Sequence, residues 1–245
     1  MITTVTFDFW ETLVTDSPEN LAAQRALRVA ALGRALAQAG AALSPTAVEE
    51  AYDRSLAVLD QRFWSRHRDP TYREQVRLVL DCAAPGAADR LEAAALEAAV
   101  TGYISPVLAF PPALQPGAAR AVEALAARGL TLGIISNTGR TPGIMLRRVL
   151  EGHGLLRHFT VLSYSDEVGY RKPDPGIFRR TLAGAGARPA EAAHVGDNPV
   201  DDVDGARGVG MRAVHFAARG RAEAPRADLV LRDLGELPER LNGSL

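Results

Sequence analysis

Side chains that could do carboxylate chemistry stand at or just beyond the ends of several apolar stretches in this 245-residue chain. Asp8 ends the first stretch, Ser136 and Asn137 end a second, Asp197 ends another, and Lys172 follows a further one. Each residue taken alone is typical of a turn, a helix cap or a solvated surface. Together they supply a nucleophilic carboxylate, donors for an anion, and two carboxylates whose hard oxygens suit Mg²⁺. Lys172 is also the only lysine among the 28 basic residues.

The stretches between these residues predict two zones of secondary structure. Residues 2–9 alternate β-branched and aromatic side chains, which indicates a strand. Helical patterns without any strand signal then follow, broken by Gly and Pro, over 19–39, 46–66, 70–82 and 87–103. Helices alternate with strands in the rest of the chain: helices over 117–128, 142–151, 174–186 and 200–208, and strands over 130–136, 159–165, 192–197, 211–216 and 227–231.

Apolar strands separated by helices are typical of a parallel sheet that is covered on both faces. We therefore predict an α/β fold, a doubly wound, Rossmann-like parallel sheet interrupted by an all-helical insertion. The core would comprise residues 1–15 and 110–245, and the insertion residues 16–109. Ligands of such sheets bind at the carboxyl ends of the strands, where the reactive side chains fall.

The composition excludes several classes of protein. The 28 basic and 29 acidic residues give a net charge of -1, with no basic excess to neutralise nucleic-acid phosphates. The single Cys82 rules out a disulfide framework. No signal-peptide pattern and no run of about 18 uncharged apolar residues is found, so we expect a cytoplasmic protein without membrane contact.

The motifs around the reactive side chains resemble those of the haloacid dehalogenase superfamily over essentially the whole chain. They are "FDFWETL" at 7–13, "IISNTG" at 134–139, "VGYRKPDPGIF" at 168–178 and "HVGDNPVDDVDGARGVGM" at 194–211. The helical insertion matches the all-helical cap of the dehalogenase-like and phosphoglycolate-phosphatase-like branches. The resemblance implies a hydrolase acting on a small, phosphorylated molecule, as a monomer or homodimer.

The resemblance also implies a role for each motif residue. Asp8 would be the nucleophile, forming an aspartyl intermediate. Asp8, Asp197 and the backbone carbonyl of Trp10 would hold Mg²⁺. Ser136 and Lys172 would bind the oxygens of the transferred group, and Lys172 would balance the charge of Asp8.

Four further residues have less defined roles. Asn137 would contact the substrate or cap the following helix. Asp201 and Asp202 compete for the second acidic place of the fourth motif, and the spacing from Asp197 favours Asp202 as a residue that orients its neighbours. His194 is interpreted as a core histidine.

Trp10 departs from the pattern of the phosphatases. The residue two positions after the nucleophile is usually an Asp that protonates the leaving group, which an indole cannot do. Glu11 or a residue of the insertion could replace that acid, or the leaving group could need no proton, as with an aryl or acyl phosphate. It could also be a halide, because 2-haloacid dehalogenases carry a Tyr at this place.

The fourth motif favours the phosphatase interpretation. The dehalogenases use no Mg²⁺ and lack its "GD" pair, and extra carboxylates would repel their anionic substrate. Phosphonate cleavage is excluded, because it needs a cap lysine and residues 16–109 contain none. A dehalogenase and a catalytically weak protein that binds a phosphorylated ligand remain as alternatives.

Residues 60–75 gather cationic and aromatic side chains at a predicted junction between two helices: Arg62, Phe63, Trp64, Arg66, His67, Arg68, Tyr72 and Arg73. Such a set could form a lid over an anionic substrate. It could equally be a solvated helix end with core aromatics.

Overall fold

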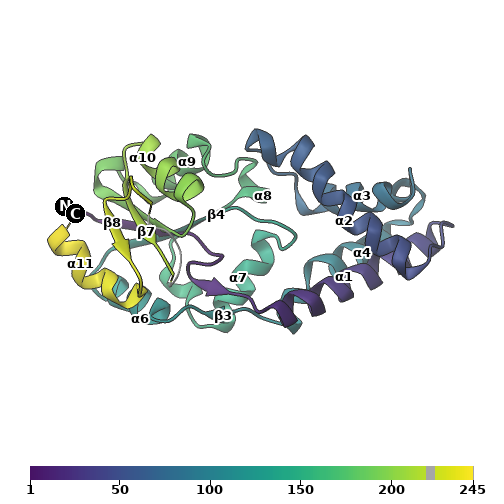
Figure 1. The fold of residues 1–245 in the computed structure, drawn as a ribbon, viewed down its shortest axis with the longest axis horizontal. Coiled ribbons are helices and arrows are strands. Elements are labelled where there is room, and N and C mark those ends of the chain that lie inside the picture. Colours follow the sequence, from purple (N-terminus) through teal and green to yellow (C-terminus); the bar gives the residue numbers. More distant parts are fainter. Residues whose placement is uncertain (219–223, 245) are drawn as a thin grey trace. The chain divides into compact units, whose positions relative to one another are not determined.

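The computed structural model describes residues 1–218 and 224–244 (Figure 1). The chain divides into two compact units. Residues 1–16, 112–137 and 150–245 form the sheet unit, and residues 17–111 with 138–149 form the helical unit. No helix in the described ranges combines the length and the apolar character needed to cross a membrane.

The sheet unit is built on a parallel sheet of six strands in the order β5-β4-β1-β6-β7-β8. The strands are β1 (Thr4–Phe7), β4 (Thr131–Ser136), β5 (Val161–Tyr164), β6 (Ala192–Gly196), β7 (Arg212–Phe216) and β8 (Leu229–Leu231). Phe7 of β1 pairs with Ile134 on one side and Val195 on the other, so three strands end at one edge. The parallel sheet predicted from the apolar runs is confirmed.

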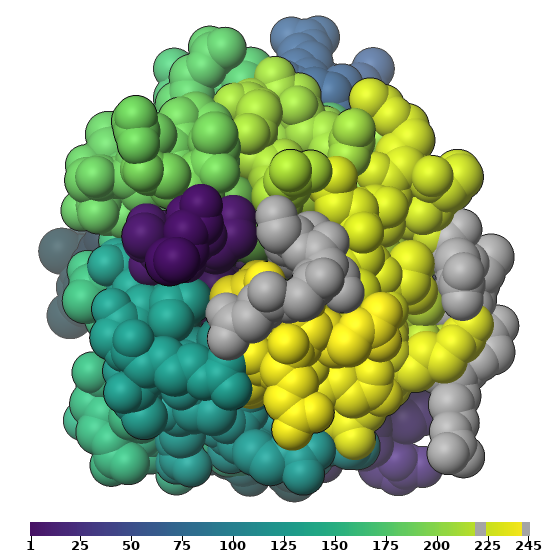
Figure 2. All heavy atoms as spheres, turned by 90° about the vertical axis from the view of Figure 1, so that its left-hand side faces the viewer, coloured from purple at the N-terminus to yellow at the C-terminus, as the bar shows by residue number. Residues whose placement is uncertain are grey.

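The start of the chain lies in the middle of this sheet. Thr3 donates a backbone hydrogen bond to Glu191 at 2.9 Å and accepts one from Thr131 at 3.0 Å. Figure 2 shows the first residues, in purple, between the teal and green segments. The first strand therefore pairs with strands more than a hundred residues later, which places Asp8 beside the later motifs.

Helices cover both faces of the sheet, which explains why its strands are apolar throughout. Figure 1 shows α9 (Pro175–Ala185) and α10 (Gly205–Gly208) on one side and α6 (Ala118–Ala127) and α11 (Leu237–Ser244) on the other. A four-residue helix, α8 (Ser165–Val168), follows β5. The predicted helix 200–208 is wrong in kind at its start, because Pro199–Asp204 form a π-helix before α10 begins.

A short antiparallel pair, β2 (Val14–Thr15) with β3 (Ala113–Leu114), was not predicted. Its strands have two residues each, too short for a periodic signal. The pair brings together the two points where the chain leaves and re-enters the sheet unit, at residues 16 and 112.

The helical unit contains the helices that the Pro and Gly breaks predicted, with shifted ends. They are α1 (Pro18–Gln38), α2 (Pro45–Arg62), α3 (Tyr72–Ala83) and α4 (Ala93–Ile104). A short helix that was not predicted, α5 (Pro106–Ala109), follows them. Serine side chains cap α1 and α2, and Thr71 forms a capping box with Glu74 at α3. Leu32, Leu36, Tyr52, Leu80 and Tyr103 lie in its core.

Residues 138–149, which the sequence assigned to the core, belong to the helical unit and include the first part of α7 (Gly143–Gly152). The side chain of Arg140 explains this. Its guanidinium lies 3.7 Å from the ring centroid of Tyr52 and donates to the Tyr103 hydroxyl at 2.7 Å. It also donates to the Tyr52 carbonyl at 2.7 Å. The loop after β4 is therefore bonded into the helices.

Candidate active site

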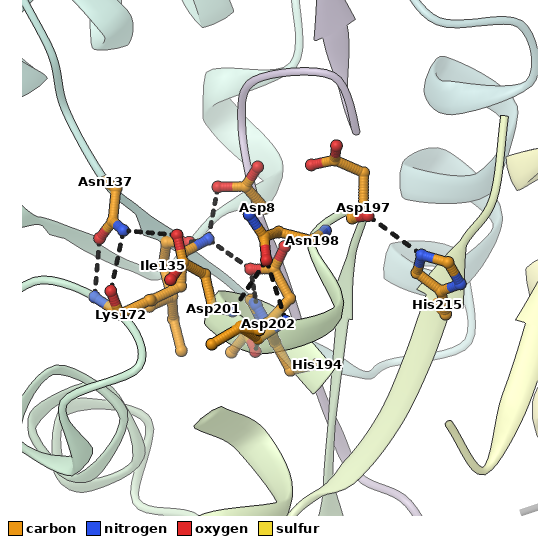
Figure 3. A network of polar contacts seen from close by, with 12 residues as sticks. Asp8, Ile135, Asn137, Lys172, His194, Asp197, Asn198, Asp201, Asp202 and His215 are labelled. Carbon is orange, nitrogen blue, oxygen red and sulfur yellow. Dashed lines mark hydrogen bonds and ion pairs between the residues drawn. The ribbon is translucent and has the colours of Figure 1, made fainter. Parts of the chain in front are cut away.

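Asp8 and Lys172 form the centre of a buried polar network at the carboxyl edge of the sheet (Figure 3). Lys172 Nζ donates to Asp8 Oδ1 at 2.5 Å and to the Ile135 carbonyl at 2.8 Å. The same ammonium lies 2.6 Å from Asp202 Oδ1. The backbone of Asp8 is fixed by a 2.8 Å hydrogen bond to the Val195 carbonyl. The lysine is thus shared between two carboxylates that come from different strand ends.

The pKa values of the two carboxylates that share Lys172 are shifted in opposite directions. Burial raises the pKa of Asp8 to about 7, against the opposing effect of the Lys172 ammonium. Burial alone would also raise the pKa of Asp202, but Lys172 and a hydrogen bond from His194 outweigh it and lower that pKa below its usual range. Burial would lower the pKa of Lys172, yet Asp202 and Asp8 raise it, so the lysine stays charged. Asp202 is therefore the permanent counterion, and Asp8 is the carboxylate whose charge a bound cation would stabilise.

The Asp202 side chain packs directly against Gly196 at the end of β6. A Cβ atom at Gly196 would lie 2.1 Å from Asp202 Cγ, so only glycine fits there. The Asn198 side chain accepts from the backbone N–H groups of Val200 and Asp201 at 2.9 and 3.0 Å and caps the π-helix. The backbone N–H of Asn198 then donates to Asp202 Oδ2 at 2.9 Å.

Asp8, Asp197 and Asp202 form an acidic cluster, in which one carboxylate oxygen from each residue lies within 4.8 Å of the other two. Carboxylates this close together repel one another. An all-oxygen donor set of this kind fits a hard divalent cation such as Mg²⁺. Within the described ranges no residue bonds Asp8 Oδ2, whereas Asp202 Oδ1 is occupied by Lys172 and His194.

Asn137 is committed to the backbone around Lys172. Its Oδ1 accepts from the Lys172 N–H at 2.7 Å, and its Nδ2 donates to the Lys172 carbonyl at 3.0 Å. Nδ2 also lies 3.2 Å from Asp201 Oδ2. We predicted a substrate contact or a helix cap for Asn137; in the structure its amide holds the lysine segment against the end of β4. Asp201 is thereby separated in role from the buried Asp202.

Ser136 has a buried hydroxyl at the end of β4. The side chain is fully buried, and its Oγ has no hydrogen bond to any described residue. Thr12 Oγ1, in the loop that follows Asp8, is in the same condition. A buried hydroxyl without a partner destabilises the fold, which makes Ser136 a candidate donor to a bound ligand.

Trp10 and Glu11 occupy the turn after Asp8. Trp10 is half-buried, and its ring meets Phe9 edge-on at 5.0 Å. Glu11 has a left-handed φ of 56°, and its carboxylate accepts from Thr15 Oγ1 at 3.2 and 3.3 Å. Glu11, which was considered as a replacement acid, therefore already accepts a hydrogen bond within its own loop.

The junction at 60–75 is partly committed inside the helical unit. Trp64 Nε1 donates to Asp69 at 2.9 Å, and Arg73 forms an ion pair with Glu97. Arg66 and His67 are exposed. These contacts are those of a helix connection, and the cationic lid remains a prediction.

Two histidines contact the acidic residues and were missed. His194 is buried, as predicted, but its Nε2 lies 3.0 Å from Asp202 Oδ1. His215 Nε2 lies 3.0 Å from the Asp197 carbonyl. A signal for His194 existed: on a strand it faces the same side as Gly196, whose missing side chain leaves room for Asp202.

Comparisons with known proteins identify the family to which the chain is similar. The family model for haloacid dehalogenase-like hydrolases matches residues 2–210. A phosphoserine phosphatase of Thermus thermophilus is 46% identical over 112 residues, which cover 46% of this chain and 43% of that protein. Haloacid dehalogenase-like hydrolase domain-containing protein 3 of Mus musculus is 42% identical over 97 residues, covering 40% and 37%. The matches thus span less than half the length of these relatives.

Solved structures agree along the whole chain. A HAD phosphatase from Thermococcus onnurineus superposes with a TM-score of 0.70 at 28% identity, covering 99% of each chain. A 2-haloacid dehalogenase from Pseudomonas syringae pv. Tomato gives the same TM-score of 0.70, identity of 28% and coverage of 99%. Because the family model covers most of the sequence and the fold agrees from end to end, the chain belongs to the haloacid dehalogenase-like hydrolases.

Proposed function

We propose that this hydrolase is a Mg²⁺-dependent phosphatase that cleaves a small phosphorylated molecule through Asp8. The acidic cluster of Asp8, Asp197 and Asp202 around one lysine carries the proposal, since its charge suits a divalent cation beside a phosphate. Partial matches to a phosphoserine phosphatase and to a phosphoglycolate phosphatase of Rhodospirillum rubrum, 33% identical over 147 residues, support it.

The reaction would use the residues at the strand ends in two displacements. An Asp8 oxygen attacks phosphorus, and the bond from phosphorus to the leaving oxygen breaks, which gives an aspartyl phosphate. Water then attacks the same phosphorus and frees the carboxylate. The proton released by that water balances the proton that the leaving oxygen takes up. Ser136 Oγ and Lys172 Nζ would donate to the phosphoryl oxygens in both steps.

Asp8, Asp197 and the backbone carbonyl of Trp10 would hold the cation. Bound there, Mg²⁺ would neutralise charge on the phosphoryl group and on the carboxylates. Asp202 would stay outside this set, because Lys172, His194 and the Asn198 N–H already occupy its oxygens.

Trp10 narrows the class of substrate. With an indole two residues after Asp8, no acid at that position protonates the leaving oxygen. A leaving group that departs as a stable anion needs no such proton. We therefore propose that activated phosphates, such as aryl or acyl phosphates, are the preferred chemical class.

A rate survey with and without Mg²⁺ tests the proposal. The substrates are p-nitrophenyl phosphate, acetyl phosphate and sugar phosphates. We expect turnover that requires Mg²⁺ and that Asp8→Asn abolishes. Turnover that is indifferent to Mg²⁺, or an Asp8→Asn variant as active as the wild type, would overturn the proposal.

Dehalogenation is the second candidate, because one observation favours it. Position 10 is aromatic, and the structure of a 2-haloacid dehalogenase superposes along the whole chain. Halide needs no proton to depart, so Trp10 would be no handicap. The acidic cluster opposes this candidate, since it repels an anionic haloacid. Chloride release from 2-chloropropionate without Mg²⁺ would favour dehalogenation over phosphate hydrolysis.

A further inference from the structure

We propose that His194 is a positioning residue whose Nε2–H fixes the Asp202 carboxylate and thereby holds Lys172 in place beside Asp8. The functional consequence rests on the proposed phosphatase activity. The geometric part concerns only the arrangement of three buried side chains from β6, the fourth motif and the third motif.

His194 is held at both ring nitrogens and on its ring. It pairs with Thr6 across the β1–β6 ladder, and the Thr6 Oγ1 atom lies 2.9 Å from His194 Nδ1. On the other side His194 Nε2 lies 3.0 Å from Asp202 Oδ1. The Phe178 ring meets the imidazole edge-on, with centroids 5.4 Å apart and planes at 90°. The ring therefore has little freedom to turn.

These contacts assign the direction of the hydrogen bonds. An ionised carboxylate only accepts, so the proton between His194 and Asp202 belongs to Nε2. The Thr6 hydroxyl can donate to Nδ1 of a neutral ring, its distance to the Ala193 carbonyl being longer, at 3.4 Å. The chain of contacts Thr6–His194–Asp202–Lys172–Asp8 then runs from the middle of the sheet to the proposed nucleophile. Figure 3 shows its members from His194 to Asp8.

Asp202 depends on His194 for its orientation. Its Oδ2 accepts from the Asn198 N–H at 2.9 Å, and its Oδ1 serves both Lys172 at 2.6 Å and His194 at 3.0 Å. Without the histidine, one bond at each oxygen remains, and rotation about Cβ–Cγ can move Oδ1 away from the ammonium. Lys172 would then pair with Asp8 alone, which weakens the nucleophile and draws the lysine from the phosphoryl oxygens.

A set of matched variants separates this role from a merely structural one. His194→Phe keeps an aromatic ring without its nitrogens, and His194→Gln restores a donor near the Nε2 position. Ser163→Ala is the control. Ser163 lies on β5, away from the acidic cluster, and its buried hydroxyl accepts a hydrogen bond from Thr181. All three variants are first compared by thermal unfolding.

The single lysine provides a readout that needs neither metal nor substrate. With ¹⁵N-labelled lysine, the side-chain amine spectrum of the metal-free protein reports Lys172 alone. We expect His194→Phe to shift or broaden that resonance, His194→Gln to return it toward the wild-type position, and Ser163→Ala to leave it unchanged. An unmoved resonance in a folded His194→Phe protein would overturn the proposal.

Kinetics on p-nitrophenyl phosphate with Mg²⁺ give the second readout. We expect His194→Phe to lower kcat by about 10–100-fold, the range typical of residues that orient a metal-site group, with a smaller change in KM. His194→Gln should recover most of that loss. A Gln variant no better than the Phe variant would contradict the assigned role. If the wild type turns over no phosphate, the proposed function fails, and the lysine resonance still decides whether His194 orients the ion pair.

Discussion

The two units both bury charged side chains, but they satisfy them in opposite ways. In the sheet unit Lys172 sits between the carboxylates of Asp8 and Asp202, at 2.5 and 2.6 Å. In the helical unit the buried Arg28 and the half-buried Arg140 donate to carbonyl and hydroxyl oxygens, and Arg28 also donates to the amide oxygen of Gln24. The first arrangement concentrates surplus negative charge at a strand edge, and the second spreads positive charge over neutral dipoles.

The difference teaches which buried charges can take part in chemistry. Arg28 reaches the Tyr103 carbonyl at 3.0 Å and the Thr141 hydroxyl at 2.8 Å, so its bonds tie a helix to the loop after β4. Neutral partners of this kind satisfy the hydrogen-bond donors of the guanidinium and fix a shape, but they do not neutralise its charge. In the acidic cluster several carboxylates lie close together, so a bound cation would relieve their mutual repulsion.

Replacing Asp8, the proposed nucleophile, should have the largest effect on activity. We expect Asp8→Asn to lose at least about 10⁴-fold in kcat on p-nitrophenyl phosphate, as nucleophile removal does elsewhere. The same change should stabilise the metal-free protein at pH 8, because it removes a buried carboxylate that ionises at a cost. Steady-state rates and thermal unfolding at pH 5 and pH 8 measure both effects.

The pH dependence follows from the raised pKa of Asp8, which moves from 3.8 to about 7. Between these values the folded protein binds a proton that the unfolded chain has lost, so the free energy of unfolding falls as pH rises. The loss is up to about 4 kcal/mol at 1.36 kcal/mol per pH unit. The Asn variant should therefore gain stability at both pH values, with a gain at pH 5 of less than half the gain at pH 8. Asp60→Asn, on the exposed side of α2, is the control; an equal gain at pH 5 and pH 8 would contradict the assignment.

The leaving group should have the next largest effect. With Trp10 in place of an acid, aryl and acyl phosphates should react about 10²–10⁴ times faster than alkyl phosphates. Trp10→Asp should narrow the gap by speeding the alkyl substrates. The measurement is kcat/KM against leaving-group pKa for both proteins. Glu11→Gln serves as the control, since a selective loss on alkyl phosphates would assign the acid role to Glu11, whereas a flat dependence with Glu11→Gln unaffected would point to another donor.

The affinity for Mg²⁺ tests directly whether the acidic cluster binds a cation. We expect Asp197→Asn to weaken Mg²⁺ binding by at least about tenfold, because ligand charge sets affinity in oxygen sites. Calorimetric titration of both proteins measures it. Asp204→Asn, in the same loop but paired with Arg226, should bind Mg²⁺ like the wild type. Equal affinity of the Asp197→Asn protein and the wild type would remove the metal site from this edge.

Arg140 should show the smallest effect on Mg²⁺ binding and a clear effect on stability. Arg140→Met removes the Arg140 donors from the Tyr103 hydroxyl and from the Tyr52 carbonyl, which keeps its hydrogen bond from Ser55, and we expect a loss of about 2–4 kcal/mol in unfolding free energy. Arg25→Met removes only half-exposed ion pairs and should cost at most about 1 kcal/mol. Urea unfolding compares them. A stable Arg140→Met protein with altered KM would make this network a binding site.

Local patterns predicted most of the framework. The apolar run 130–136 contains β4 at Thr131–Ser136, and the pairs Ser17-Pro18 and Ser44-Pro45 mark the starts of α1 and α2. The expectation that reactive side chains gather at the carboxyl ends of parallel strands also predicted that Asp8 lies close to Lys172, 164 residues later in the chain. Periodicity and strand-end position are properties of short segments, so one sequence reveals them.

The unpredicted features depend on pairings between distant segments. Nothing local to Asn137 shows that its amide binds the backbone of Lys172, and nothing local to His194 shows that Thr6 lies beside its Nδ1. The π-helix at Pro199–Asp204 is a local exception, which helical periodicity alone does not distinguish from an α-helix.

The membership of residues 138–149 in the helical unit has a consequence for exchanging parts between relatives. The chain passes between the units after residues 16, 111, 137 and 149, not only at the two ends of the long insertion. A chimera that transplants 17–111 alone would separate Tyr52 and Tyr103 from Arg140. The helical unit is discontinuous in sequence, so an exchange of this unit should carry both segments together.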